Sequence, residues 1–295
     1  MEQYRGDIYA ILTACAWSVA VIFFKLSGHY LNTVQLKVFQ NVVAVLLFFA
    51  CIVVSTEPLT LQLTAHEWWL VVISAVAGIT LGDTLFIAAI NRIGASLQAI
   101  VDVLYMPFVM GLAFVFFGER LPAQVFWGAG LVLLAIAAAN MDMHLRPVPK
   151  RQLFVGIGLA LLAQFLMACC VVMLKNLLQS QSLLTLTAYR FLIGTVALIV
   201  FYAVRGRGSH IFHGFRPSRA WLVTLPGAFL GPFLATLFWF AGFKYTLAGK
   251  AAIYNQLSTI LIVIMAALFL KEKLTRHRIA AILLAIAGSY LVLTS

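Results

Sequence analysis

Long apolar runs constrain the fold of this chain more than any other feature of its sequence. Ten runs of roughly 18 to 23 residues lie near residues 8–27, 34–54, 68–90, 96–117, 123–140, 154–174, 184–204, 220–243, 249–270 and 277–294. The chain is 63% hydrophobic and only 10% charged, whereas a soluble domain is about 25% charged. Runs this long predict helices, because an open chain in lipid must bond its backbone polar groups internally. We therefore expect an all-α integral membrane protein with ten transmembrane helices.

The sequence also contains an internal repeat. Residues Gly6–Lys25 match Gly156–Lys175, with a glycine start and a lysine end at one offset. Residues Trp68–Leu121 match Trp221–Leu274 without a gap. The chain therefore reads as two copies of one five-helix unit.

These copies predict the domain organisation. The first half spans residues 1–145 and the second 152–295, with a basic linker at 146–151. Because five is odd, the second copy must insert upside down relative to the first. Inverted repeats recur in secondary transporters, whose binding sites lie near the bilayer midplane between the repeats. The repeat therefore predicts transport of a small-molecule substrate.

The net charge of +11 arises from basic loops and does not indicate a nucleic-acid surface. Lysine and arginine cluster between the apolar runs, at 146–151, 205–219 and 271–278, as the positive-inside rule describes. Twelve of the 20 basic residues lie in loops after odd-numbered helices, and five lie in the opposite loops. We expect no nucleic-acid partner, and the rule places both termini outside the cytoplasm.

Residues 82–121, GDTLFIAAINRIGASLQAIVDVLYMPFVMGLAFVFFGERL, and their copy at 241–274 resemble the EamA family of the drug/metabolite transporter superfamily. The shared pattern is a glycine-rich third helix, a small fourth helix with a mid-span proline and a closing G-E-x-L. Pro107 has no counterpart in the second half, where Ile260 stands.

The resemblance implies a ten-helix exporter or exchanger in the bacterial inner membrane. Its cargo would be a small polar metabolite such as an amino acid or amine, often exchanged for protons. Helices 1, 3, 4, 6, 8 and 9 would line a central cavity, with helices 5 and 10 at the periphery.

Asp102 is an ionisable residue inside an apolar run. Gln98 and Tyr105, at i−4 and i+3, share its helical face. Ionisable groups at membrane depth are candidates for function, so Asp102 could bind a proton or a substrate amine. The alternative is a clamp between helices, with Lys25 or Arg92 as partner.

Asp83 is the second such carboxylate. It shares a helical stripe with Asn91. Burial favours the protonated form of a carboxyl group, which makes Asp83 a candidate proton carrier. The alternative is a hydrogen bond from a neutral Asp83 to a neighbouring helix.

The corresponding positions of the second half are neutral, since Thr236 aligns with Asp83 and Asn255 with Asp102. Tyr254, Asn255 and Ser258 place donors and acceptors together. They could bind substrate or hydrogen-bond helix to helix.

The remaining candidates are cations and tryptophans. Lys25 and Lys250 are candidates to pair with the aspartates or a substrate carboxylate, whereas we expect Lys37 and Lys175 to extend toward the headgroups. Trp17 and Trp239 lie deep enough to form a cavity wall or to pack as ordinary core.

Other functions fit the sequence less well. A passive channel or facilitator, or a translocase for lipid-type substrates, would also present polar groups in the membrane. An intramembrane enzyme would need catalytic or metal-binding groups, yet all six histidines map to loops or helix ends, and HEWW at 66–69 lacks the second histidine of a zinc helix. We predict no catalytic residue, metal or cofactor, and a monomer or homodimer in the bilayer.

Overall fold

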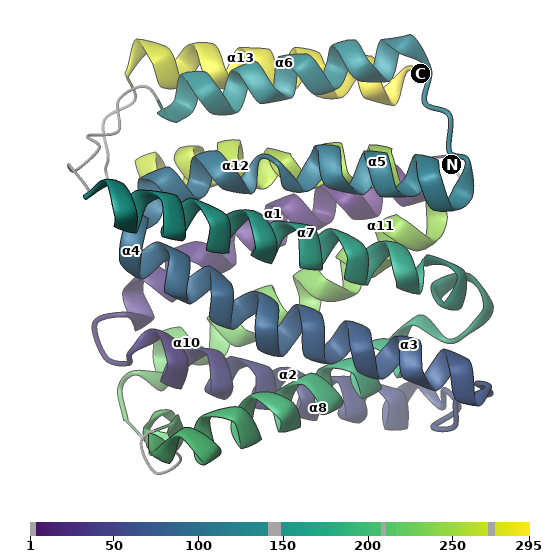
Figure 1. Ribbon diagram of the computed structural model, residues 1–295, viewed down its shortest axis with the longest axis vertical. Helices are drawn as coiled ribbons and strands as arrows, with labels where there is room; N and C mark the ends of the chain where they lie inside the picture. The colour runs from purple at the N-terminus through teal and green to yellow at the C-terminus, as the bar shows by residue number, and fades with distance from the viewer. Residues whose placement is uncertain (1–3, 141–148, 208–210, 217, 271–274) are drawn as a thin grey trace.

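The computed structural model describes residues 4–140, 149–207, 211–216, 218–270 and 275–295 (Figure 1). Helices of the first half are α1 (Arg5–Ser27), α2 (Thr33–Ser55), α3 (Ala65–Ala75), η2 (Val76–Gly82), α4 (Asp83–Asp102), α5 (Tyr105–Phe117) and α6 (Ala123–Asn140). Those of the second are α7 (Lys150–Ser180), α8 (Leu183–Tyr202), η3 (Ala203–Arg207), η4 (Phe212–Phe215), α10 (Trp221–Ala228), η5 (Phe229–Ala235), α11 (Thr236–Tyr245), α12 (Ala248–Leu270) and α13 (Arg276–Leu293). Residues 146–148 of the expected linker lie outside the described part, and α7 includes its last two residues.

Apolar helices account for every predicted run. Seven described helical spans are long and apolar enough to cross a membrane. Three shorter apolar helices, Tyr105–Phe117, Ala123–Ala138 and Ile279–Leu293, coincide with further predicted runs. The all-α prediction is confirmed, while the count of ten crossings stays a prediction.

The two repeats share an unusual local structure. A π-helical segment, η2, joins α3 to α4, and another, η5, joins α10 to α11. The alignment of Trp68 with Trp221 pairs the first residues of the two segments, Val76 and Phe229, and also their last residues, Gly82 and Ala235. Such i→i+5 segments are rare and frequently mark functional sites.

Helices of one repeat pack against helices of the other throughout the bundle. The contacting pairs include α1 with α11 and α12, α7 with α4 and α5, α2 with α8, and α6 with α13. Exchanging the repeats turns the contacts of α1 into those of α7 and leaves the α2–α8 and α6–α13 pairs unchanged, which is the pattern of a two-fold relation. Figure 1 shows α6 and α13 together at one edge of the bundle, as the resemblance implies for helices 5 and 10.

Glycine allows close approach at that edge. A Cβ on Gly128 of α6 would lie 2.7 Å from the carbonyl oxygen of Gly288 of α13, and a Cβ on Gly288 would lie 2.7 Å from that of Gly128. The two backbones therefore approach more closely than side chains would permit, as is common between membrane helices.

The helix α4 crosses the boundary between the third and fourth runs. The runs 68–90 and 96–117 leave a connection at 91–95, and the third membrane-length span is Ala65–Ile93. The helix α4 nevertheless extends through Asp102, and turn residues Val103 and Leu104 precede α5. Pro107 has no N–H to donate to the Val103 carbonyl, which instead accepts from the Met106 N–H at 3.4 Å. In the second repeat Ile260 carries that donor, and α12 continues without a break.

Both chain ends lie at one end of the helices (Figure 1). We call this the termini end, which includes Asp7, Glu119 and Thr246. The opposite end, which includes Asn32, Asn91 and Lys150, is called the basic end.

Candidate functional site

Asp83 and Lys37 form an ion pair within the first repeat. The Lys37 Nζ lies 2.9 Å from the Asp83 Oδ2, and the side chains are 27% and 20% exposed. Asp83 stands at the start of α4, directly after η2. The prediction that Lys37 extends toward the headgroups is therefore wrong.

The expected lysine partners of the aspartates lie elsewhere. Lys250 donates to the backbone carbonyl of Ser295 at 2.7 Å, because its position at the start of α12 faces the end of α13. Lys25 is exposed in the last turn of α1. The expected pairing with Asp83 is thus supplied by Lys37 on α2.

Asp102 lies in a cluster of amide side chains. The Gln98 Nε2 donates to its Oδ1 at 2.6 Å, and the Gln164 Nε2 of α7 donates to the same oxygen. The Gln256 Nε2 of α12 donates to the Asp102 backbone carbonyl at 3.2 Å. Asp102 therefore links α4 to α7 and α12.

These contacts between helices agree with the clamp that we considered, but the described partners of Asp102 are amides rather than Lys25 or Arg92. Arg92 Nη1 donates to the Ala88 carbonyl of its own helix at 2.9 Å. Sequence reasoning missed Gln164, although it is the one amide within the apolar stretch 154–175. An isolated amide in such a helix needs a partner, and that was the available signal.

Arg190 of α8 lies at the centre of the bundle with only 2% of its surface exposed. Its Nη2 donates to the Ser74 carbonyl at 3.4 Å, and its Cζ lies 5.1 Å from the Phe240 ring centroid. A Cβ on Gly78 in η2 would lie 2.7 Å from that Nη2. Arg190 therefore does not extend to the headgroups, although the sequence places it near a helix end.

Tyr105 lies beside this arginine. It is 7% exposed and belongs to the main hydrophobic cluster, against which Trp239 packs. Trp239 contacts the ring of Phe240 at 4.8 Å between centroids. The structure therefore brings Tyr105 and Trp239, both predicted site residues, to one region next to Arg190.

The neutral candidates of the second repeat lie on α12. Both side-chain polar atoms of Asn255 are buried without a hydrogen-bond partner among the described residues, as is the Tyr254 hydroxyl. The Ser258 hydroxyl donates to the Asn255 carbonyl at 2.7 Å. Asn255 thus has unused hydrogen-bonding capacity, whereas Ser258 bonds its own helix.

Trp17 lies outside the buried centre. It is 36% exposed and meets Phe24 edge to face at 5.8 Å between ring centroids. The structure does not bring it together with Trp239.

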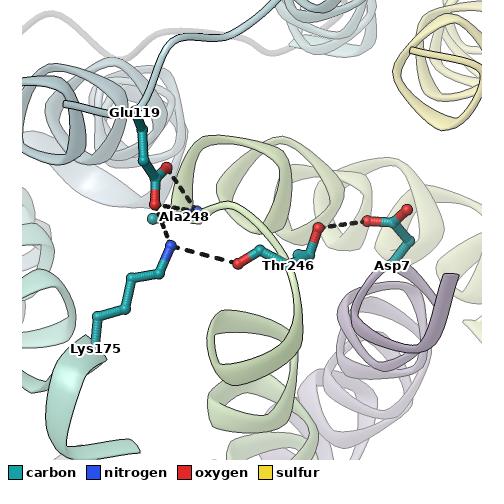
Figure 2. A network of polar contacts seen from close by, with 5 residues as sticks. All are labelled: Asp7, Glu119, Lys175, Thr246 and Ala248. Carbon is teal, nitrogen blue, oxygen red and sulfur yellow. Dashed lines mark hydrogen bonds and ion pairs between the residues drawn. The ribbon is translucent and has the colours of Figure 1, made fainter. Parts of the chain in front are cut away.

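A network of buried polar contacts closes the termini end (Figure 2). Lys175 of the second repeat is ion-paired with Glu119 of the first, with side chains 8% and 7% exposed. Lys175 also donates to the Thr246 carbonyl at 3.4 Å, and the Thr246 hydroxyl donates to Asp7 at 2.9 Å. The prediction that Lys175 extends toward the headgroups is therefore wrong.

Glu119 has a second partner at the start of α12. The Ala248 N–H donates to its Oε2 at 2.9 Å, and the positive end of a helix favours an anion there. The closing G-E-x-L pattern, which includes Glu119, did not predict this role. The network joins α1, α7, the α11–α12 connection and the loop after α5.

The basic end carries a pocket. It has a volume of about 230 Å³ and is lined by Asn32, Thr33, Val34, Gln35, Ile87, Asn91 and Ile211. Asn32 caps α2, accepting from the Gln35 N–H at 2.9 Å. Ile87 and Asn91 lie one and two turns beyond Asp83 on α4, so the pocket lies over the helical face that carries the Asp83–Lys37 pair.

Comparison with known proteins agrees with this architecture. The sequence profile of the EamA-like transporter family matches residues 4–141 and 154–294. The chain belongs to the EamA-like transporter family. It is therefore a multi-pass membrane protein of the drug/metabolite transporter type. The family consists of transporters rather than enzymes.

Similarity to a solved structure concerns the fold alone. A protein crystal structure matches with a TM-score of 0.81 at 13% sequence identity. The match covers 97% of this chain and 95% of the chain in that structure. No curated protein matches the sequence.

Proposed function

We propose that this EamA-like protein is a secondary transporter that exports or exchanges small polar metabolites, amino acids and amines among them, by alternating access. The observation that carries the proposal is the contrast between its two ends. Polar bonds between the repeats, from Lys175 and Ala248 to Glu119 and from Thr246 to Asp7, close the termini end, whereas a pocket opens at the basic end.

The closing contacts suit a gate. Each joins groups from separate helices, so a rocking motion of one repeat against the other would break them together. The interior between the ends contains polar groups that a cargo could use, such as Asp102 and Asn255. Alternating access by such rocking is the mechanism that inverted repeats support.

Asp83 and Asp102 are the candidate proton carriers. Asp83 is paired with a cation, and Asp102 with neutral amides. A proton arriving at Asp83 would release Lys37, and one arriving at Asp102 would turn an acceptor into a donor. Each event changes the contacts between helices, as coupling to transport requires.

Uptake into proteoliposomes tests the proposal. The purified chain is reconstituted and offered amino acids, amines, nucleobases and organic phosphates, with and without a pH gradient. We expect saturable uptake of at least one zwitterionic or amine-bearing probe, which the gradient increases and a protonophore reduces. Uptake equal to that of protein-free liposomes for the whole panel would refute transport of small polar metabolites.

A further inference from the structure

Arg190 is a buried cation without a carboxylate partner within the described part of the chain. The described ion pairs within 4 Å join Lys37 to Asp83 and Lys175 to Glu119. Asp83 acts on Arg190 electrostatically, but its own ion pair is with Lys37. The Arg190 Nε is buried and has no hydrogen-bond partner in the part of the chain that the structure describes.

This arrangement is unusual for a membrane interior. A buried charge is expected to be paired and fully hydrogen-bonded, because its desolvation is otherwise unfavourable. The long contact to the Ser74 carbonyl, the contact with the Cys170 thiol and the Phe240 ring offset only part of that loss. Charged groups at such depth usually face a substrate or ion path.

The other repeat does not need a cation at this position. At the offset that relates Gly6 to Gly156, Arg190 aligns with Gln40 of α2, which is also buried. A neutral amide thus satisfies the equivalent packing position. The charge at Arg190 is therefore not required by the repeat architecture.

Arg190 lies where many helices converge. It touches Ser74 of α3, Gly78 of η2 and Phe240 of α11, and it interacts electrostatically with Tyr105 of α5 and Cys170 of α7. Elements from both repeats therefore surround the guanidinium, which is where an alternating-access transporter places its cargo.

We propose that Arg190 binds the carboxylate of the transported substrate, so that the cargo is a small organic acid or zwitterion rather than a simple amine. This inference rests on the proposed transport function and specifies its substrate class. The planar guanidinium presents a fork of N–H donors that matches a carboxylate in bidentate fashion. Its Nε is one such donor, and it has no partner among the described residues.

The aspartate cluster would complement this site. Gln164, which holds Asp102, and Cys170, which interacts with Arg190, lie six residues apart on α7, or about 9 Å along its axis. A cargo could therefore present an anionic group to Arg190 and a cationic or donor group toward Asp102.

Matched acids and amides test the inference. L-Leucine, γ-aminobutyrate and glutarate are each compared with the carboxamide that lacks the anionic charge, by thermal stabilisation of the purified full-length protein and by uptake into proteoliposomes. We expect wild type to prefer at least one acid over its amide by tenfold or more. Arg190→Gln, which copies Gln40, should reduce that preference to near unity and leave amide binding unchanged.

Arg190→Lys and Lys244→Gln complete the design. Arg190→Lys keeps the charge but loses the fork, so acid affinity should fall about tenfold, and this variant tests the inference if Arg190→Gln does not fold. Lys244→Gln removes a cation that bonds the Gln181 carbonyl at 3.0 Å, and it should keep the acid preference. The inference is overturned if no acid is preferred by wild type, or if the preference persists without Arg190. Uptake of amines or amides without acid preference would retain the transport function and reject only the role of Arg190.

Discussion

Lys175 of the second repeat and Glu119 of the first form a buried ion pair at the termini end, and the two residues share that end with Thr246 and Ala248. The pair joins segments 56 residues apart in sequence. It ties one repeat to the other outside the apolar core.

Removing one partner of this pair should destabilise the protein. Glu119→Gln leaves the Lys175 ammonium buried without a counter-charge, and such changes lower the free energy of unfolding by about 3–5 kcal/mol. Thermal unfolding of the purified protein measures the loss. The double variant Glu119→Gln/Lys175→Gln should recover part of it, because no charge then remains buried.

Glu67 provides the control for that experiment. It is an exposed acid that caps α3 through Thr64, whose N–H donates to it at 2.7 Å. Glu67→Gln preserves the cap geometry, so it should shift thermal unfolding much less than Glu119→Gln does. Equal losses of thermal stability for Glu119→Gln and Glu67→Gln would show that the buried ion pair stabilises the protein no more than the acid that caps α3.

Lys37 and Asp83 should show energetic coupling. Single variants Lys37→Gln and Asp83→Asn and their combination form a double-mutant cycle, measured by thermal unfolding. For groups in direct contact we expect an interaction of at least about 0.5 kcal/mol. A cycle of Lys250→Gln with Asp83→Asn should be additive, because Lys250 bonds Ser295. Coupling in the second cycle and none in the first would contradict the observed pairing.

Gly78→Ala should displace Arg190. The new methyl group would lie 2.7 Å from its Nη2 and 3.4 Å from the Cys170 Sγ, and such overpacking costs about 1–3 kcal/mol. Acid binding should fall with stability. Gly111→Ala on α5 meets no atom within 4 Å, so it should be neutral or stabilise by up to about 1 kcal/mol. Similar effects of both changes would argue against a packed guanidinium at Gly78.

Asp102→Asn separates proton coupling from structure. Asparagine keeps an oxygen that can accept from Gln98 and Gln164 but cannot exchange a proton. We therefore expect a folded protein that still exchanges substrate down its gradient and no longer responds to a pH gradient. Uptake that stays pH-driven in Asp102→Asn and Asp83→Asn alike would reject both residues as proton carriers.

Hydrophobicity and repetition sufficed to predict the helices. The predicted run 34–54 corresponds to α2, and 184–204 to α8 with the start of η3, because long apolar segments have few alternatives in lipid. The π-helical segments were not predicted, since hydropathy does not distinguish i→i+5 from i→i+4 bonding. The interruption at Val103 depends on a single absent N–H at Pro107.

Partners of polar residues were harder to predict than their presence. Asp83 and Asp102 were recognised as notable, but their partners Lys37 and Gln164 lie on other helices. Pairing of this kind depends on helix rotation and depth, which one sequence does not fix. Arg190 lies near the start of the predicted run 184–204, yet the structure buries it among helices of both repeats.

Exchange kinetics test the central claim most directly. Proteoliposomes are loaded with a labelled substrate from the panel, and its efflux is measured with and without unlabelled substrate outside. Alternating access predicts that external substrate accelerates efflux several-fold, because the loaded carrier returns faster than the empty one. An efflux rate that external substrate leaves unchanged, as a channel would give, would contradict the account.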